Sequence, residues 1–276
     1  MRSKRHKAGR AFIFCLLLVI GIVAVYPLLY MVTGSMKTSL EFVRHPAAWP
    51  EGWYVDNYKA LFYRFSLLRL FTNTFICVLG AFLLTHAVTI PASYAFAKLR
   101  FRSRLALYTV MIATMAIPGI TFIIPNFLLM SRMGLVDHFG SVILMWSVGA
   151  VPGNVFLMTS LMRGMPDEML QAVKIDGANY LQLMLRIVIP ISLPGIVTLS
   201  IFNTTSWYND LMTPLIYLQS DQMKTMTVAV ATILGRFDSD YPLLLSGLVL
   251  VSLPPVIIYL LLQGYIRKGL VVGSIK

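Results

Sequence analysis

Apolar residues run along this chain in six long stretches that are almost free of charge. Their approximate ranges are 11–36, 70–97, 105–131, 139–162, 187–216 and 243–266. Each is longer than the about 20 residues that an α-helix needs to cross the hydrocarbon core of a membrane. The strands of a transmembrane barrel would instead be alternating segments of roughly 10 residues. The pattern therefore predicts an all-α, polytopic membrane protein, with one domain of six transmembrane helices over residues 1–276.

Positive charge gathers on one side of this arrangement. With the N-terminus inside, the inside segments 1–10, 98–104, 163–186 and 267–276 hold 15 of the 23 Lys and Arg residues. They also carry the whole net charge of +12. This is the positive-inside distribution, so it predicts that both termini are cytoplasmic and explains the basic composition without nucleic acid. The first apolar run is long and lacks a small-residue cleavage site, which predicts a retained helix rather than a signal peptide.

Motifs for catalysis are missing from the sequence. It has no phosphate-binding G-x-x-x-x-G-K-[ST] loop, no H-E-x-x-H pair and no G-x-S-x-G elbow. The four histidines are scattered, and Cys15 and Cys77 lie in different apolar runs, so we expect neither a metal site nor a disulfide framework. His86 lies inside the second run, where an ionisable side chain is a functional candidate by default. A hydrogen bond from His86 to a neighbouring helix is the simpler interpretation.

Between the fourth and fifth runs the pattern changes, because residues 163–190 are charged and amphipathic. Pro166 suits the first turn of a helix, and the acidic Asp167 and Glu168 suit the positive N-terminal end of its dipole. Asp176-Gly177 then predicts a sharp turn, since glycine readily takes a positive φ. The segment therefore predicts a helix, a turn and a second helix on the cytoplasmic face, with an apolar side buried against another protein.

The same segment, MPDEMLQAVKIDGANYLQLMLRIVIPISLPG, resembles the EAA loop of permease subunits in binding-protein-dependent ABC importers, in particular the maltose-type branch for carbohydrate uptake. The matching positions are Pro166, Glu168, Ala172, Asp176, Gly177, Ala178 and Pro190, whereas Gln171 and Val173 replace the usual Glu and Ala. Other blocks follow in family order, among them PLLYMVTGSMKT (27–38), NTF (73–75), ASYAFAKLRFRSR (92–104), NDLMTPLI (209–216) and the tail 263–276.

The resemblance implies a type I importer permease that passes a sugar, an oligosaccharide or a sugar-like solute through a bacterial or archaeal plasma membrane. It also implies a second, homologous permease subunit, two ATPase subunits on the cytoplasmic face that hold ATP and Mg, and an extracytoplasmic binding protein. This chain would contain no cofactor and no catalytic residue. Coupling to the ATPase would use Pro166, Asp167, Glu168, Gln171, Ala172, Val173, Asp176 and Gly177. The alternatives are a permease for phosphate, peptides or amino acids, a secondary transporter, and a membrane-integral enzyme.

Two further groups of residues are candidates for contact with solute or partner. Asn203, Ser206 and Asp210 share one face of the fifth helix and, with Trp207 and Asn209, would line a pathway for a hydroxyl-rich solute. The alternative is that they form hydrogen bonds between helices. In the outside loop 218–242, the residues proposed to contact the binding protein are Arg236, Phe237, Asp238, Asp240 and Tyr241. The alternative is that these charges only keep the loop solvated.

Overall fold

The computed structural model describes residues 2–175, 177–233 and 240–272, and within these ranges the regular structure is entirely helical. The chain forms two compact units, each built from segments that are distant in the sequence. One combines residues 1–67 with residues 229–254, and the other combines residues 68–228 with residues 255–276.

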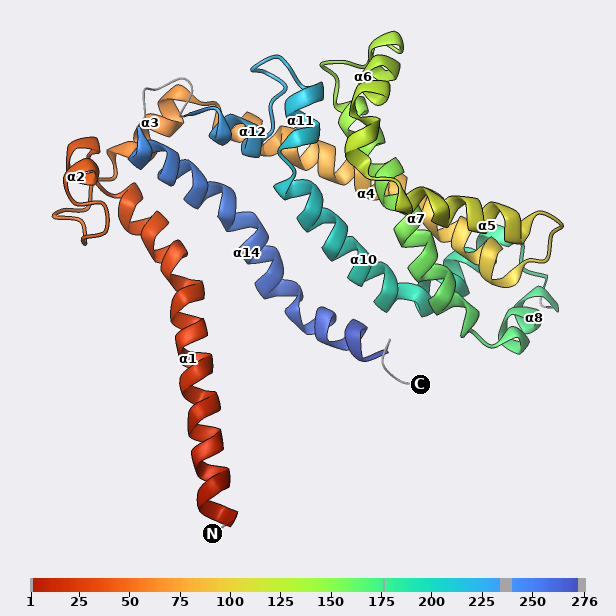
Figure 1. Cartoon of the computed structure of the whole chain (residues 1–276). Helices are drawn as coiled ribbons and strands as arrows, with labels where there is room; N and C mark the ends of the chain where they lie inside the picture. Colours follow the sequence, from red (N-terminus) through yellow and green to blue (C-terminus); the bar gives the residue numbers. More distant parts are fainter. Residues whose placement is uncertain (1, 176, 234–239, 273–276) are drawn as a thin grey trace. The chain divides into compact units, whose positions relative to one another are not determined.

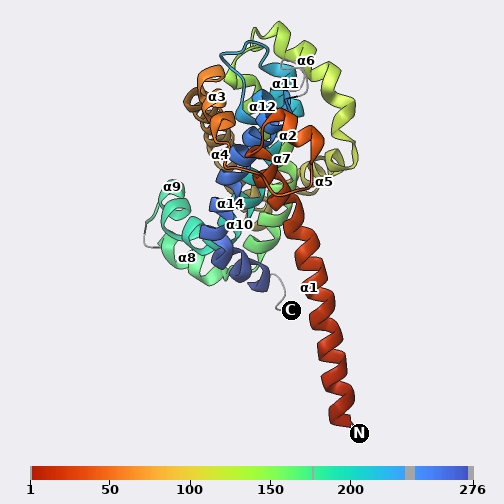
Figure 2. The ribbon, with the colours of Figure 1, turned by 90° about the vertical axis from the view of Figure 1, so that its left-hand side faces the viewer.

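The first unit is built on the long helix α1 (Arg2–Ser35), which Figures 1 and 2 show as one continuous rod. The short helices α2 (Ser39–Arg44) and α3 (Asp56–Arg64) follow it, and the beginning of α14 (Tyr241–Val272) packs beside them. Side chains from Phe12 to Leu28 are exposed along α1. Their apolar composition suits a hydrocarbon environment, as expected of a first membrane helix.

Buried polar side chains hold the α1–α2 corner of this unit. Lys37 is completely buried, and its ammonium donates hydrogen bonds to the carbonyl oxygens of His45 at 2.7 Å and Pro46 at 3.2 Å. The amide of Asn57 donates to the Ser35 and Lys37 carbonyls, both at 2.8 Å. Backbone oxygens that would lack a donor are thereby satisfied. These bonds give the lysine near the end of the 27–38 block a structural role.

The second unit is organised around α4 (Leu67–Lys98), α7 (Phe139–Arg163) and α10 (Ile189–Asn209). Two clusters of buried side chains join these helices. One contains Tyr94, Met158, Met162, Val188, Ile196 and Leu199, and the other contains Cys77, Ala81, Val142, Trp146 and Trp207. His86 of α4 meets the Ser200 hydroxyl of α10 at 2.8 Å, so the expected hydrogen bond to a neighbouring helix is confirmed.

The third predicted helix, over 105–131, is not continuous in the structure. The structure has α5 (Arg104–Ala113) and α6 (Ile123–Arg132), with short 3₁₀ turns between them, and the two arms are bent by 96°. The break falls at Pro118, which lacks an N–H and forces the preceding residue into an extended conformation. Ile117 accordingly has φ −90° and ψ 122°.

The described residues contain five helices that are long and apolar enough to cross a membrane, or six if the bent pair is one span. The five are Phe12–Ser35, Leu67–Lys98, Phe139–Arg163, Tyr180–Asn209 and Tyr241–Leu261. The fourth of these ends before residue 216, where the sequence pattern had placed its end. It ends at Asn209 because the Asp210 carboxylate accepts hydrogen bonds from the Met212 and Thr213 N–H groups at the start of α11 (Met212–Tyr217).

Candidate coupling and pathway sites

The predicted helix–turn–helix is present between the fourth and fifth apolar runs. α8 (Asp167–Ile175) is followed by Gly177 with φ +82° and then by the short α9 (Tyr180–Leu183). Asn179 and Gln182 form a reciprocal capping box at the start of α9. A π-helical turn over Met184–Val188 then leads into α10. Figure 2 shows α8 and α9 beside each other.

The two faces of α8 have different surroundings. Leu170 is buried and Val173 is half-buried, and both pack into the cluster that contains Tyr94, Met158 and Met162. The apolar side was expected to be buried against another protein. Leu170 and Val173 are instead covered by the chain's own helices, whereas the apolar Ala172 and Ile175 are exposed. In and beside α8, exposed residues include Pro166, Asp167, Glu168, Gln171, Ala172, Ile175 and Gly177. Asp176 lies outside the described residues. The free face is therefore mixed, because the polar Asp167, Glu168 and Gln171 lie beside the apolar Ala172 and Ile175, and Ile175 is 85% exposed.

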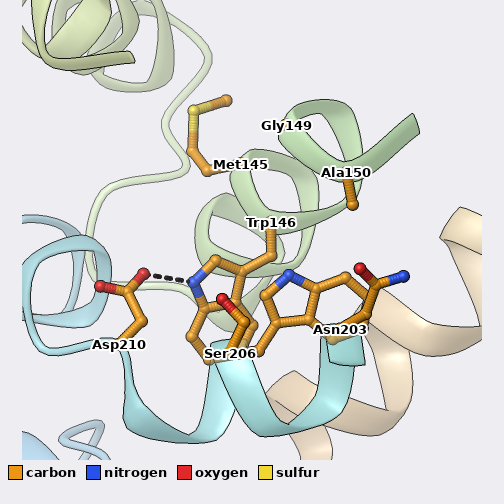
Figure 3. Close-up of a pocket in the computed structure, with 8 residues that line it drawn as sticks. Met145, Trp146, Gly149, Ala150, Asn203, Ser206 and Asp210 are labelled. Atoms are coloured by element: carbon orange, nitrogen blue, oxygen red, sulfur yellow. Dashed lines mark hydrogen bonds between the residues drawn. The ribbon is translucent and has the colours of Figure 1, made fainter. Parts of the chain in front are cut away.

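Four of the five pathway candidates lie together in a cavity of about 300 Å³ between α7 and α10 (Figure 3). They are Asn203, Ser206, Trp207 and Asp210, and the opposite wall consists of Met145, Trp146, Gly149 and Ala150. Asn209 is not in this wall, and its side-chain amide donates to the Thr205 carbonyl of its own helix at 2.9 Å. Sequence patterns had not singled out Trp146, since a tryptophan in an apolar run gives no signal of its partner.

Asp210 acts mainly as a fixed acceptor in this cavity. One carboxylate oxygen accepts from the Trp146 Nε1–H at 2.7 Å (Figure 3), and the other accepts from the Met212 N–H at 2.9 Å. The Trp146 and Trp207 rings stack with centroids 6.1 Å apart and an interplanar angle of 11°. Asp210 therefore lines the cavity and also joins α7 to the end of α10 through a hydrogen bond.

The groups left to meet a ligand in the cavity are neutral and polar. The Asn203 amide nitrogen is buried and has no hydrogen-bond partner among the described residues, and Ser206 is exposed to the cavity. No Lys or Arg lines the cavity. Its chemistry suits hydroxyl and carbonyl groups better than a phosphate or carboxylate.

The residues proposed to contact a binding protein are only partly within the described chain. Arg236, Phe237 and Asp238 lie outside it. Asp240 accepts from the Leu243 N–H at 3.2 Å and from the Ser39 hydroxyl at 3.3 Å, and Arg64 is 3.9 Å away. Tyr241 stacks on Phe42 with centroids 5.7 Å apart. Asp240 and Tyr241 therefore already have a role in starting α14 and packing it on α2.

The first half of the same outside loop is fixed by residues of other blocks. The Asn73 amide donates to the carbonyls of Gln222 at 2.8 Å and Lys224 at 2.9 Å. The Asp137 carboxylate accepts from the N–H groups of Gln219 and Ser220, both at 2.9 Å, and from the Ser220 hydroxyl at 3.1 Å. These bonds, that from the Ser220 N–H above all, hold the pKa of Asp137 below its ordinary value. The block 73–75 thus positions the loop after α11.

Comparison with known proteins defines the class. The chain belongs to the family described as binding-protein-dependent transport system inner membrane component, whose model matches residues 87–272. It is an ABC transporter permease of this family, as the helical fold and the α8–α9 segment had indicated. No group of three or more His, Cys, Asp or Glu side chains that could hold a metal occurs among the described residues.

Relatives extend over almost the whole chain. The inner membrane ABC transporter permease protein YcjP of Escherichia coli is 25% identical over 100% of both chains. The arabinooligosaccharides transport system permease protein AraQ of Bacillus subtilis is 27% identical over 99% of this chain and 98% of its own. A solved bacterial ABC transporter involved in import of the acidic polysaccharide alginate has a chain of the same fold, with a TM-score of 0.82, 21% identity and coverage of 96% and 98%.

Proposed function

We propose that this chain is the permease subunit of an ATP-driven importer for a sugar, an oligosaccharide or a sugar-like solute. It works with a second, homologous permease, two ATPase subunits that bind ATP and Mg on the cytoplasmic side, and an extracytoplasmic binding protein. The whole chain forms one membrane domain of six spans, with both termini in the cytoplasm of a bacterial or archaeal cell. Its own role is alternating access, without catalysis.

One observation carries the proposal, namely the position of α8 relative to the cavity. α8 follows α7 after a three-residue connection, and its apolar side packs in the same cluster as residues of α7 and α10. α7 and α10 also supply the cavity walls. A push on the exposed face of α8 would thus move the two helices that line the cavity. The residues that would receive it are Glu168, Gln171, Ala172 and Ile175. Closely packed interiors transmit such movements because they resist compression.

The carbohydrate class rests on two supports. Relatives over nearly the full length include permeases named for arabinooligosaccharides and for diacetylchitobiose. The cavity offers Asn203 and Ser206 as neutral hydrogen-bonding groups beside an indole pair, and its lining contains a carboxylate but no cation. This arrangement disfavours phosphate and other anions, which proteins bind with Arg, Lys or helix N-termini.

Uptake by the reconstituted system tests the proposal. Proteoliposomes would contain this chain, its partner permease and the ATPase, with loaded binding protein added outside, and would be given radiolabelled oligosaccharides. We expect uptake and ATP hydrolysis only when all components are present. Uptake by this chain alone, driven by an ion gradient, would indicate a secondary transporter. Hydrolysis or modification of the sugar by this chain alone would indicate a membrane enzyme.

A further inference from the structure

A lysine outside the helix–turn–helix segment forms hydrogen bonds with both the end of α7 and the start of α8. Lys98 is the last residue of α4. Its ammonium donates hydrogen bonds to the Met165 carbonyl at 2.6 Å, to the Asp167 carboxylate at 2.7 Å and to the Arg163 carbonyl at 3.3 Å. A lysine ammonium has three N–H groups, and all three are used here. The Lys98 side chain is only 9% exposed, whereas that of Asp167 is 69% exposed.

The position of this ammonium suits the charges around it. Arg163 ends α7, where the last carbonyls lack partners within the helix and carry the negative end of the helix dipole. Asp167 begins α8. Lys98 therefore joins the end of one helix to the start of the next from a third helix. The Arg163 side chain does not compete, since its guanidinium lies 5.5 Å from the centre of the Tyr108 ring.

The other attachments of α8 are different in kind. Leu170 and Val173 make apolar contacts in the cluster around Tyr94, and such contacts are not directional. Within the described part of the chain, Lys98 supplies the one side-chain hydrogen bond between α8 and a membrane helix. Apolar contacts alone would allow α8 to slide over α4. Charge-assisted hydrogen bonds fix both distance and direction.

We propose that Lys98 is a positioning residue for coupling, which makes α4 move together with α7 and α8 when the ATPase displaces α8. This inference rests on the proposed function and adds a residue that the loop motif does not contain. Without the ammonium, α8 and α7 would still be connected covalently, but α4 would follow them only through apolar packing. The ATPase would then turn over without moving the second unit as one body.

Lys98→Met in the complete reconstituted transporter tests this role, because methionine keeps an apolar stem and removes the donors. We expect normal assembly and ATP hydrolysis, with about a tenfold loss of solute imported per ATP, the scale of one lost hydrogen bond to a charged group. Lys59→Met is the matched control, since Lys59 forms a 2.7 Å pair with Asp56 that is 65% and 50% exposed. It should leave the ratio unchanged.

A double-mutant cycle separates positioning from direct contact with the ATPase. If Asp167 acts through Lys98, adding Asp167→Asn to Lys98→Met should reduce the ratio no further, whereas independent effects would multiply. Effects that multiply, or an unchanged ratio of solute imported per ATP in Lys98→Met, would overturn the role of Lys98. The proposed function would stand in either case as long as the wild type shows ATP-driven uptake. If the Lys98→Met protein does not accumulate in the membrane, the test uses Asp167→Asn, which removes the carboxylate partner of Lys98. Coupling in Asp167→Asn equal to that of the wild type would refute the proposal. Absence of ATP-driven uptake in the wild type would refute the proposed function itself.

Discussion

Replacing Gly177 by alanine should uncouple ATP hydrolysis from uptake while the protein remains folded. Gly177 has φ +82°, and a Cβ built there meets no atom within 4 Å. The cost is therefore conformational and not steric. A left-handed conformation costs a residue with a Cβ about 1–2 kcal/mol. That corresponds to a roughly 5- to 30-fold lower population of molecules in which the α8–α9 turn has its native shape.

Gly134 is a matched control in the same unit. It has φ +68°, also with no atom within 4 Å of its Cβ, but it lies in the turn that follows α6. Gly134→Ala should therefore cost a similar conformational energy without altering α8. The assay measures solute imported per ATP hydrolysed in proteoliposomes, together with the thermal stability of both variants. Gly177→Asn should recover part of the coupling, because asparagine tolerates the left-handed region better than alanine.

The expected result is a lower coupling ratio in Gly177→Ala and an unchanged ratio in Gly134→Ala, at comparable thermal stability. Full coupling in Gly177→Ala would show that the turn does not determine the direction of α8. An equal loss in both variants would show that general destabilisation, and not the α8–α9 turn, limits coupling.

Three other predictions concern packing and the outside loop. Gly80→Ala should lower the unfolding free energy by about 1–3 kcal/mol through overpacking, because its Cβ would lie 3.0 Å from Ile143 Cγ1 of α7. Gly21→Ala, with no atom within 4 Å of its Cβ, should not. Thermal unfolding in detergent measures both. Asn73→Ala should speed amide exchange at residues 222–226, because two carbonyls lose their donor, while Asn209→Ala should not. The pKa of Asp137 is lowered in the folded protein. The ionised carboxylate therefore contributes stability at pH values above its ordinary pKa of 3.8, and this contribution is lost as the pH falls through the lower pKa of the folded state. The protection of the amides of residues 217–220, measured against their intrinsic exchange rates at each pH, should therefore fall with acid in the wild type. An acid dependence of this protection equal to that of Asp137→Asn would contradict the prediction.

The sequence predicted the helical class and the position of the helix–turn–helix because these depend on local signals. Apolar length indicates a span, and Pro166 and Gly177 mark the start of one helix and the turn after it. The bend at Pro118 was missed, because proline inside a membrane helix can either be accommodated or break the helix, and tertiary neighbours decide between the two.

Contacts between distant segments account for the other differences. The apolar side of α8 was assigned to a partner because a periodic pattern shows that a face is buried but not what covers it. The pairs Trp146–Asp210 and Lys98–Asp167 are separated by about 65 residues or more, and no local signal connects them. The role of Asn73 in holding the outside loop likewise depends on a contact about 150 residues away.

Cysteine cross-linking at neighbouring positions of α8 tests the central claim most directly. On a background without Cys15 and Cys77, single cysteines would be placed at Ala172, which is exposed, and at Val173, which packs into the chain's own cluster. In the assembled transporter, a short bifunctional maleimide should join the Ala172→Cys variant to the ATPase subunit, and addition of ATP should change the yield. The Val173→Cys variant should not react with the ATPase. Two results would contradict the claim that the exposed face of α8 receives the movement of the ATPase. One is a cross-link from Val173→Cys alone, and the other is no cross-link from either variant in a transporter that imports solute.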